Sequence, residues 1–324
     1  MRHLGSIERR QRLSRKQFEN EYVLTSKPVI LEGALVGCRA LDWTLDYLKE
    51  TVGDLPVCAK QSSSNIHPDL YASSETSKER VCRLSMAQYI DVAFSANDSG
   101  THYFLSGDEL QFFHAGMNNQ QLAPLRADFD LPPYFDHQVL DTVGFWLSAA
   151  GVVSALHYDN NGDHNLNAQM VGSKHARLLA PDQVRHVYPF LASKDLNGGN
   201  FSRVDIRAPD LAAFPQFAAA ECLEGQLNAG ELLFIPALWY HSFVHTGAVN
   251  VNVNFWWRPM TYYLSSATAR WILIDGVAKL VSRILNTEGP SGVEQVMTAD
   301  VRQFLELLER DLVDDAQRTP APRG

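Results

Sequence analysis

The triplet His157-Tyr158-Asp159 is the segment of this sequence that most directly suggests metal chemistry. Side chains two residues apart on a β-strand point to the same side, so an imidazole and a carboxylate with this spacing can bind one ion. A second triplet of the same pattern, His67-Pro68-Asp69, lies in a polar segment, contains a proline and has no strand-like flanks. We therefore favour the first triplet, although an isolated H-x-D motif is a weak signal.

A third ligand is expected from a histidine far along the chain. His241 follows GELLFIPALWY (230–240), which is typical of a turn, a buried strand and a proline-marked bend. His245 is the rival ligand because it would share a face with His241 on a regular strand. A core histidine packed among aromatic residues is the alternative for His241. Two histidines and one carboxylate on one face of an octahedron are the arrangement of non-haem iron(II) oxygenases.

Lys174 lies 15 residues after Asp159, at the start of an apolar segment. Such a lysine is usually a solvated charge at the end of a strand. Iron(II), two neutral histidines and one aspartate carry a net charge of about +1, and a dicarboxylate cosubstrate would make the site negative. A buried cation is then needed at the far carboxylate, since an unpaired buried charge is costly.

Amide side chains alternate with apolar side chains in two segments, which contain Asn165, Asn167 and Gln169 in the first and Asn250, Asn252 and Asn254 in the second. Amides are poor strand formers, so a whole polar face needs an explanation. The face is either exposed to solvent or lines a wet cavity, where amides bind a carboxylate or orient metal ligands. The sequence leaves both interpretations open.

Short strands between turn residues are expected from about 142 to 257, at 142–148, 152–158, 165–171, 175–180, 231–235 and 249–257. Most are not separated by a helix long enough for a parallel crossover, which favours a sandwich or barrel. The preceding part is predicted to hold helices at 14–22, 44–52 and 85–94, a short strand at 28–31 and a loop at 61–80.

The sequence resembles the JmjC/cupin-like 2-oxoglutarate oxygenases over about residues 28–257. The resemblance rests on VSALHYD (153–159), NAQMVGSKHARLLAPDQ (167–183), APDLAAFPQF (208–217) and LNAGELLFIPALWYHSF through NVNFWW (227–257). The part around GELLFIPALWYH is especially similar to the tRNA wybutosine hydroxylases, and it also resembles the hydroxylases of asparaginyl or arginyl side chains. The resemblance implies a mainly β fold, a double-stranded β-helix or jelly roll with N-terminal helices.

The resemblance also implies roles for particular residues and the cofactors iron(II), 2-oxoglutarate and O2. His157, Asp159 and His241 match the metal triad, and Lys174 matches the lysine that binds the 5-carboxylate of 2-oxoglutarate. Ser154, Asn165 and Asn254 match positions near the cosubstrate, and Tyr103 is the candidate for a tyrosine that contacts it, although Phe104 beside it is the better-aligned position. The NNGDH loop (160–164) is slightly long for the Asn165 match.

Residues 1–260 are predicted to form the oxygenase domain, and 261–324 a C-terminal helical region with a disordered tail. Apolar residues recur at helical spacing in 263–286 and 292–312. Some relatives form homodimers through such a helical pair, so a homodimer is the hypothesis here. Packing of the pair on its own domain is the alternative.

Composition excludes several classes of protein. The 324 residues are 45% hydrophobic and 20% charged with a net charge of -9, which does not favour a broad surface for nucleic acid. A local basic patch is possible near the N-terminus, at Arg9, Arg10, Arg12, Arg15 and Lys16. No signal-like or membrane-spanning run is seen and no cysteine pair is spaced C-x-x-C, so we expect a cytoplasmic protein with reduced thiols.

The expected activity is insertion of one oxygen atom into a C–H bond of a protein or peptide side chain. Alternatives are hydroxylation of tRNA or of a small molecule, and removal of an N-methyl group. A non-catalytic cupin module would be free to lose the His/Asp/His set, and a cupin enzyme without 2-oxoglutarate would not need Lys174. Five aromatic residues are candidates for the substrate pocket, with core packing more typical for most of them: Trp146, Tyr158, Trp239, Trp256 and Trp257.

Overall fold

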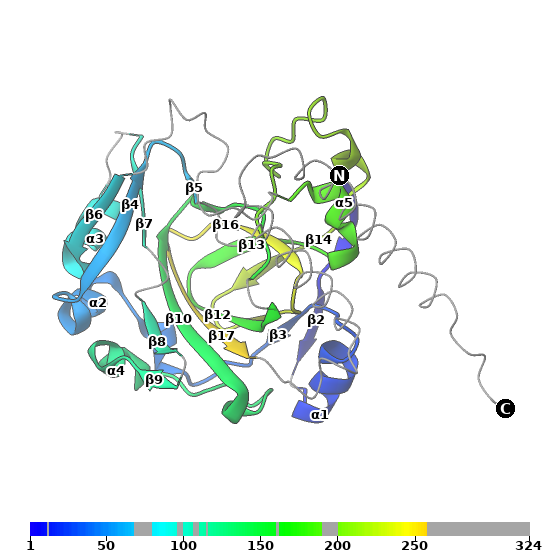
Figure 1. Ribbon diagram of the computed structural model, residues 1–324. Helices are drawn as coiled ribbons and strands as arrows, with labels where there is room; N and C mark the ends of the chain where they lie inside the picture. Colours follow the sequence, from blue (N-terminus) through cyan, green and yellow to red (C-terminus); the bar gives the residue numbers. More distant parts are fainter. Residues whose placement is uncertain are drawn as a thin grey trace, which may run out of the picture.

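The computed structural model describes residues 1–11, 13–67, 80–95, 100–105, 110–114, 116–159, 162–189 and 200–257. Two large β-sheets face each other, and a small third sheet lies beside them (Figure 1). The six-stranded sheet has the order β1 (Arg2–Ser6), β14 (Glu221–Asn228), β13 (Ser173–Leu179), β16 (Tyr240–His245), β11 (Val153–Ser154) and β5 (Ile66–His67). The eight-stranded sheet has the order β2 (Glu8–Gln11), β3 (Val29–Glu32), β15 (Leu232–Ile235), β12 (His164–Val171), β17 (Val249–Trp257), β10 (Leu140–Ala149), β8 (Gln111–His114) and β9 (Met117–Asn118). The small sheet is β6 (Arg80–Ser85), β4 (Pro56–Ser62) and β7 (His102–Leu105).

Strands β10 to β17 alternate between the two large sheets, apart from the antiparallel pair β13–β14. Neighbours within this run are antiparallel, as in β12 with β15 and β17 and in β13 with β16. This connectivity is that of a double-stranded β-helix, and it confirms the predicted mainly β jelly roll.

The eight-stranded sheet buries both of its faces, but with different chemistry. Its outer face packs apolar side chains such as Phe145, Leu166 and Phe255 against a core that includes residues from α1 (Arg15–Phe18), α2 (Leu45–Val52) and α3 (Met86–Ala93). Its inner face carries the six alternating amides, and each of these is at most 6% exposed. Their burial decides between the two interpretations: the amides line the interior of the jelly roll and do not face solvent.

The predicted N-terminal helices are present, with side-chain caps that their sequences explain. Ser14 and Ser85 each form a capping box with a glutamine three residues later, and Thr44 accepts a hydrogen bond from the backbone N–H of Tyr47. Beyond α1 the chain continues as a π-helix (Glu19–Val23). The other helical elements are α4 (Ala123–Arg126), α5 (Val184–Val187) and the 3-10 turns Arg39–Asp42, Gln120–Leu122, His137–Val139, Pro181–Gln183 and Pro215–Ala219.

The prediction of a strand over 152–158 is wrong beyond Ser154. Successive backbone N–H groups there donate to different segments: Ala155 to the carbonyl of His67, His157 to that of His241 and Tyr158 to that of Asn200. No single partner strand continues alongside, so His157 forms only isolated bridges.

The predicted loop at 61–80 is also partly wrong, because β4 extends to Ser62 and β5 places His67 beside Ser154. These pairings join segments far apart in the chain, which local composition does not reveal.

Some predictions fall on residues outside the described ranges, namely Arg12, the second half of the His67-Pro68-Asp69 triplet, and the C-terminal helical region with its proposed dimer contact. None of the described helices is long and apolar enough to cross a membrane. None of the four cysteines forms a disulfide.

Candidate metal centre

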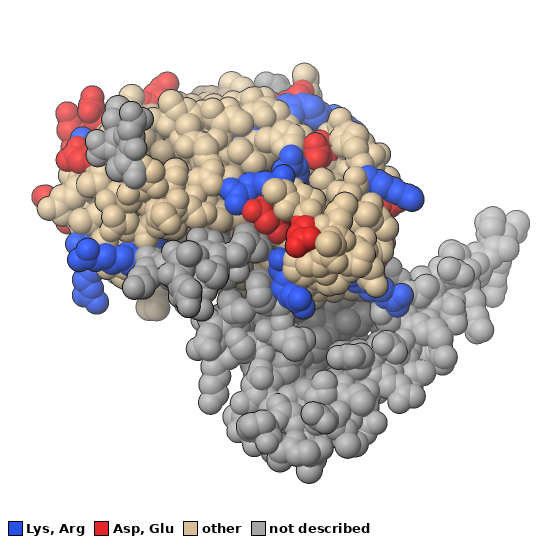
Figure 2. All heavy atoms as spheres, turned by 90° about the horizontal axis from the view of Figure 1, so that it is seen from above, with Lys and Arg blue, Asp and Glu red and all other residues tan. Residues whose placement is uncertain are grey.

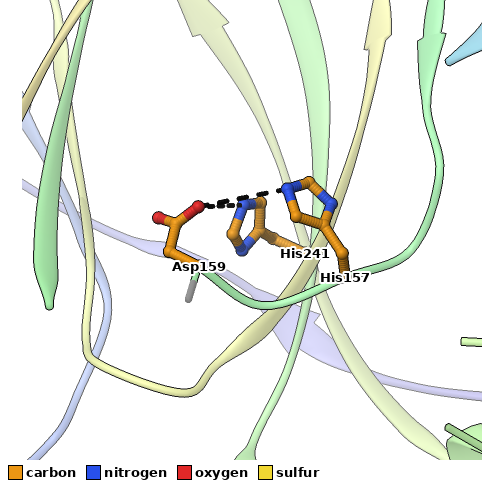
Figure 3. Close-up of side chains that lie close together, drawn as sticks. All are labelled: His157, Asp159 and His241. Carbon is orange, nitrogen blue, oxygen red and sulfur yellow. Dashed lines mark ion pairs between the residues drawn. The ribbon is translucent and has the colours of Figure 1, made fainter. Parts of the chain in front are cut away.

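Three side chains converge inside the jelly roll: His157 and Asp159, which follow β11, and His241 from β16 (Figure 3). The Nε2 atoms of His241 and His157 lie 3.6 and 4.0 Å from Oδ1 of Asp159. One ligand atom from each residue lies within 4.8 Å of the others, and the described part of the chain contains no other such group. The distances are too long for hydrogen bonds, and a single ion can be shared by the three atoms.

Each histidine is oriented through its second ring nitrogen. Nδ1 of His157 lies 2.7 Å from the carbonyl oxygen of Ala155, and Nδ1 of His241 lies 3.0 Å from that of Trp239. A carbonyl only accepts, so Nδ1 carries the proton in both rings. The lone pair of each Nε2 then faces the centre, which is the tautomer that binds a metal.

Asp159 is held ionised with one oxygen free. Its Oδ2 accepts hydrogen bonds from Asn165 Nδ2 at 2.8 Å and from Trp256 Nε1 at 2.9 Å. Burial would raise the pKa of Asp159, but the two imidazoles and these two hydrogen bonds outweigh burial and lower the pKa below its usual value. Oδ1, which accepts no hydrogen bond among these contacts, faces the two histidines.

His157 is suited to metal binding at neutral pH. Burial, followed by the neighbouring His241, lowers the pKa of His157 to about 4. One face of its ring is covered by Phe201, with ring centroids 5.1 Å apart. The centre therefore offers two imidazoles and one carboxylate, a donor set that fits iron(II) and leaves further coordination positions open.

The backbone before His241 turns sharply, as the proline in GELLFIPALWYH predicts. The N–H of Trp239 donates to the carbonyl of Pro236, and Leu238 between them has φ 65°. Non-glycine residues in this region carry a cost of about 1–3 kcal/mol, which surrounding contacts must offset. Leu238 is buried in an apolar cluster with Leu156. This packing stabilises the bend that begins β16.

The rival histidine lies elsewhere in the interior. His245 pairs with Lys174 in register, whereas His241 pairs with Leu178. The Nδ1 atom of His245 is buried without a hydrogen-bond partner. The structure thus brings His241, and not His245, to His157 and Asp159.

Lys174 is 1% exposed, so it is a buried cation and not a solvated charge at the end of a strand. Its Nζ donates to Oδ1 of Asn167 across the interior at 2.8 Å and lies 4.3 Å from the ring centroid of Phe243. No carboxylate of the described residues pairs with it. Burial lowers the pKa of Lys174 to about 7. A buried ammonium with one amide partner is prepared for an anion.

The remaining residues predicted to lie near the cosubstrate have different surroundings. Ser154 is half-buried, and its carbonyl accepts from the hydroxyl of Ser242. Asn254 is buried and accepts from Asn252. Tyr103 packs against the large apolar core, a different location from that of its neighbour Phe104.

Phe104 stacks on His67, the histidine of the rejected H-x-D triplet, with ring centroids 4.9 Å apart. Since His67 pairs with Ser154, Phe104 lies nearer to the predicted cosubstrate residues than sequence position suggests.

Sequence reasoning missed two functional contacts. Trp256 was considered only as a pocket residue, yet it donates to Asp159, and Asn167 had no assigned partner, yet it contacts Lys174. The signal was the alternation itself, because Trp256 continues the inward face of Asn252 and Asn254. Tyr158, Trp239 and Trp257 lie in apolar clusters, as expected for core aromatics.

Two further buried histidines, His164 and His245, predict sensitivity to acid. Burial lowers the pKa of both His164 and His245 to about 3, and Nδ1 of His164 accepts a hydrogen bond from the N–H of Ala237. Below the unfolded pKa of about 6.5, the unfolded chain binds protons that the native chain does not. The free energy of unfolding should therefore be highest above this pH and fall by about 1.4 kcal/mol per pH unit for each histidine as the pH decreases towards 3.

The variant His164→Asn tests this expectation, because an amide oxygen can replace Nδ1 as acceptor without titrating. In urea unfolding, the wild type should lose about 2 kcal/mol more than the variant between pH 7 and pH 5. Equal losses would mean that His164 is protonated in the native protein.

Comparisons with known proteins agree with the fold. The cupin-like domain family matches residues 15–262. The chain is 30% identical over 265 residues to human tRNA wybutosine-synthesizing protein 5, covering 78% of each chain. It is 29% identical to lysine-specific demethylase 8 of Xenopus tropicalis and to JmjC domain-containing protein D of Dictyostelium discoideum, covering 75% and 70% of this chain. It spans 51% of the length of each of these two relatives.

The family match covers most of the chain, and it includes both β11 and β16 with the three converging side chains. The chain belongs to the cupin-like domain family, and it is an enzyme of the JmjC class of 2-oxoglutarate-dependent oxygenases.

Proposed function

We propose that this protein is an iron(II)- and 2-oxoglutarate-dependent hydroxylase, with His157, Asp159 and His241 as the iron ligands. The observation that carries the proposal is the convergence of two imidazole nitrogens and one carboxylate oxygen inside the jelly roll. When bound, iron(II) and 2-oxoglutarate activate O2, so that one oxygen atom enters a C–H bond and the cosubstrate becomes succinate and carbon dioxide.

The chain supplies the geometry for this reaction. His157 and His241 present Nε2 because their Nδ1–H groups are bound to backbone carbonyls. Lys174 lies inside the jelly roll, where an ammonium can bind the distal carboxylate of the cosubstrate. Its present contacts, to Asn167 and Phe243, do not neutralise its charge. Lys174 separates this proposal from a cupin enzyme that works without 2-oxoglutarate.

We propose a protein or peptide side chain as the substrate. The chain has a net charge of -9, and two of the five residues that suggested a basic patch are paired with carboxylates: Arg9 with Glu32 and Glu231, and Arg10 with Glu21. On the face seen in Figure 2, the basic side chains of the described residues lie in separate groups, several of them beside acidic side chains. Binding to phosphates needs a continuous basic area.

A tRNA substrate is the second candidate. The observation that favours it is the similarity to tRNA wybutosine-synthesizing protein 5 over 78% of both chains.

Demethylation of an N-methyl group uses the same C–H chemistry and would release formaldehyde.

The test is succinate formation by the purified protein with iron(II), ascorbate and 2-oxoglutarate, alone and with added peptide pools or tRNA. We expect slow succinate formation without substrate and stimulation by peptides, with a mass increase of one oxygen atom. Stimulation by tRNA would replace the proposed substrate, and formaldehyde release would replace the proposed outcome. Absence of both turnover and metal binding would favour a non-catalytic module.

A further inference from the structure

The indole N–H of Trp256 donates a hydrogen bond to Asp159, and the indole ring lies against Gly144. We propose that Trp256 and Asn165 are positioning residues that fix Oδ2 of Asp159, so that Oδ1 alone faces the metal. Gly144 provides the space for the indole ring of Trp256. The inference rests on the proposed iron site and adds to it the residues that set how the carboxylate binds.

The two donors come from a matched position in the sheet. Asn165 on β12 and Trp256 on β17 lie directly opposite each other. Opposed side chains project to the same face with Cβ atoms about 5 Å apart, so both can reach one acceptor. Their N–H groups lie 2.8 and 2.9 Å from Oδ2, and hydrogen bonds to a carboxylate are roughly twice as strong as neutral ones.

Gly144 on β10 is the third part of this arrangement. A Cβ atom at this position would lie 2.7 Å from Cζ3 of Trp256, closer than real Cβ atoms come to other atoms, and 3.2 Å from Cη2, closer than most real Cβ contacts. The glycine does not have a positive φ, so its backbone conformation does not require glycine. The absence of a side chain at 144 is explained by the indole ring that lies there.

Simple core packing does not account for Trp256. It is absent from the apolar clusters of the described residues, whereas its neighbour Trp257 belongs to the large core. Trp146, on the same inner face of the sheet, has a buried Nε1 without a hydrogen-bond partner. An indole N–H in this interior is thus not paired by default, and the contact to Asp159 is specific to Trp256.

A carboxylate with Oδ2 occupied in this way can give the metal one oxygen, and its rotation about the Cβ–Cγ bond is restricted. Groups that orient a metal ligand typically contribute about 10-fold to 100-fold to metal affinity. We therefore expect Trp256 to affect metal binding itself, before any cosubstrate or substrate is present.

The experiment is a titration of the metal-free protein with cobalt(II), in which the d–d absorption band is recorded because it reports how the metal is coordinated. Trp256→Phe removes the N–H and keeps most of the ring, while Gly144→Ala keeps the tryptophan but displaces it. Both should weaken cobalt binding by about 10-fold to 100-fold and change the absorption band. Trp146→Phe is the matched control, since it removes a neighbouring indole N–H that does not contact Asp159, and its affinity should stay within about twofold.

The outcomes separate this inference from the proposed function. Wild-type affinity and an unchanged band in Trp256→Phe and Gly144→Ala would overturn the positioning role and leave the iron site in place. Failure of the wild type to bind cobalt would remove the metal site and the inference with it. If Trp256→Phe does not fold, as judged by circular dichroism, Gly144→Ala decides, because it retains every core side chain.

Discussion

The variant His241→Ala is expected to lose metal binding and to form no detectable succinate. His241 is one of three converging ligands, and its Nε2 lies 3.6 Å from Oδ1 of Asp159. Two remaining ligands bind a divalent ion weakly, and the space left by the imidazole admits water in place of a fixed donor. Titration with cobalt(II) or iron(II) in the absence of O2 checks the metal, and succinate measurement checks turnover.

The matched control is His245→Ala, on the same strand and the same face of β16. His245 is also a buried histidine, but it lies beside Lys174 and not among the converging ligands. Its replacement should leave metal affinity close to that of the wild type. Loss of the metal in His245→Ala with retention in His241→Ala would assign the third ligand to the rival histidine.

The sequence predicts this centre well because its signals are local. The short strands and the bend at Pro236 depend on neighbouring residues, and they predict a sandwich or barrel and the direction of His241; the jelly roll itself is implied by the family resemblance. The sequence also predicts that His157 and Asp159 lie close together, as they do, but the reason given, a regular strand, is wrong. The two residues do not lie on a regular strand, since the backbone from Ala155 onward pairs with several segments.

What the sequence could not predict depends on contacts between distant segments. The inner amides could have faced solvent, and only the closure of the second sheet over them settles their burial. The contact from Trp256 to Asp159 joins residues from β17 and the segment after β11, and no local pattern encodes it. The choice between Tyr103 and Phe104 depends on β7, whose position comes from pairing with β4.

The variant Lys174→Met should weaken 2-oxoglutarate binding by about 30-fold or more, since removing one partner of a buried charge pair costs at least about 2 kcal/mol. Methionine fills a similar volume without charge, so the jelly roll should still fold and bind metal. Isothermal titration with the metal-loaded protein under nitrogen measures the affinity. The expected loss applies to binding, in contrast to His241→Ala, where the metal itself is lost.

The pH dependence of this affinity provides a second signature. Burial lowers the pKa of Lys174 to about 7, and only the protonated ammonium attracts the distal carboxylate. Wild-type affinity for 2-oxoglutarate should be greatest below about pH 7 and fall by up to about tenfold per pH unit above it, until the pKa of the bound form is reached. In Lys174→Met this slope should disappear.

A ligand without the distal carboxylate tests whether Lys174 binds that group. 2-Oxobutanoate retains the keto acid that would contact the metal but cannot pair with Lys174. The wild type should bind 2-oxoglutarate much more tightly than 2-oxobutanoate, and Lys174→Met should bind the two with similar affinity, because the variant removes the same interaction as the truncated ligand. If the preference survives in Lys174→Met, the distal carboxylate binds elsewhere, and the buried ammonium would need another anion to explain its position beside Asn167 and Phe243.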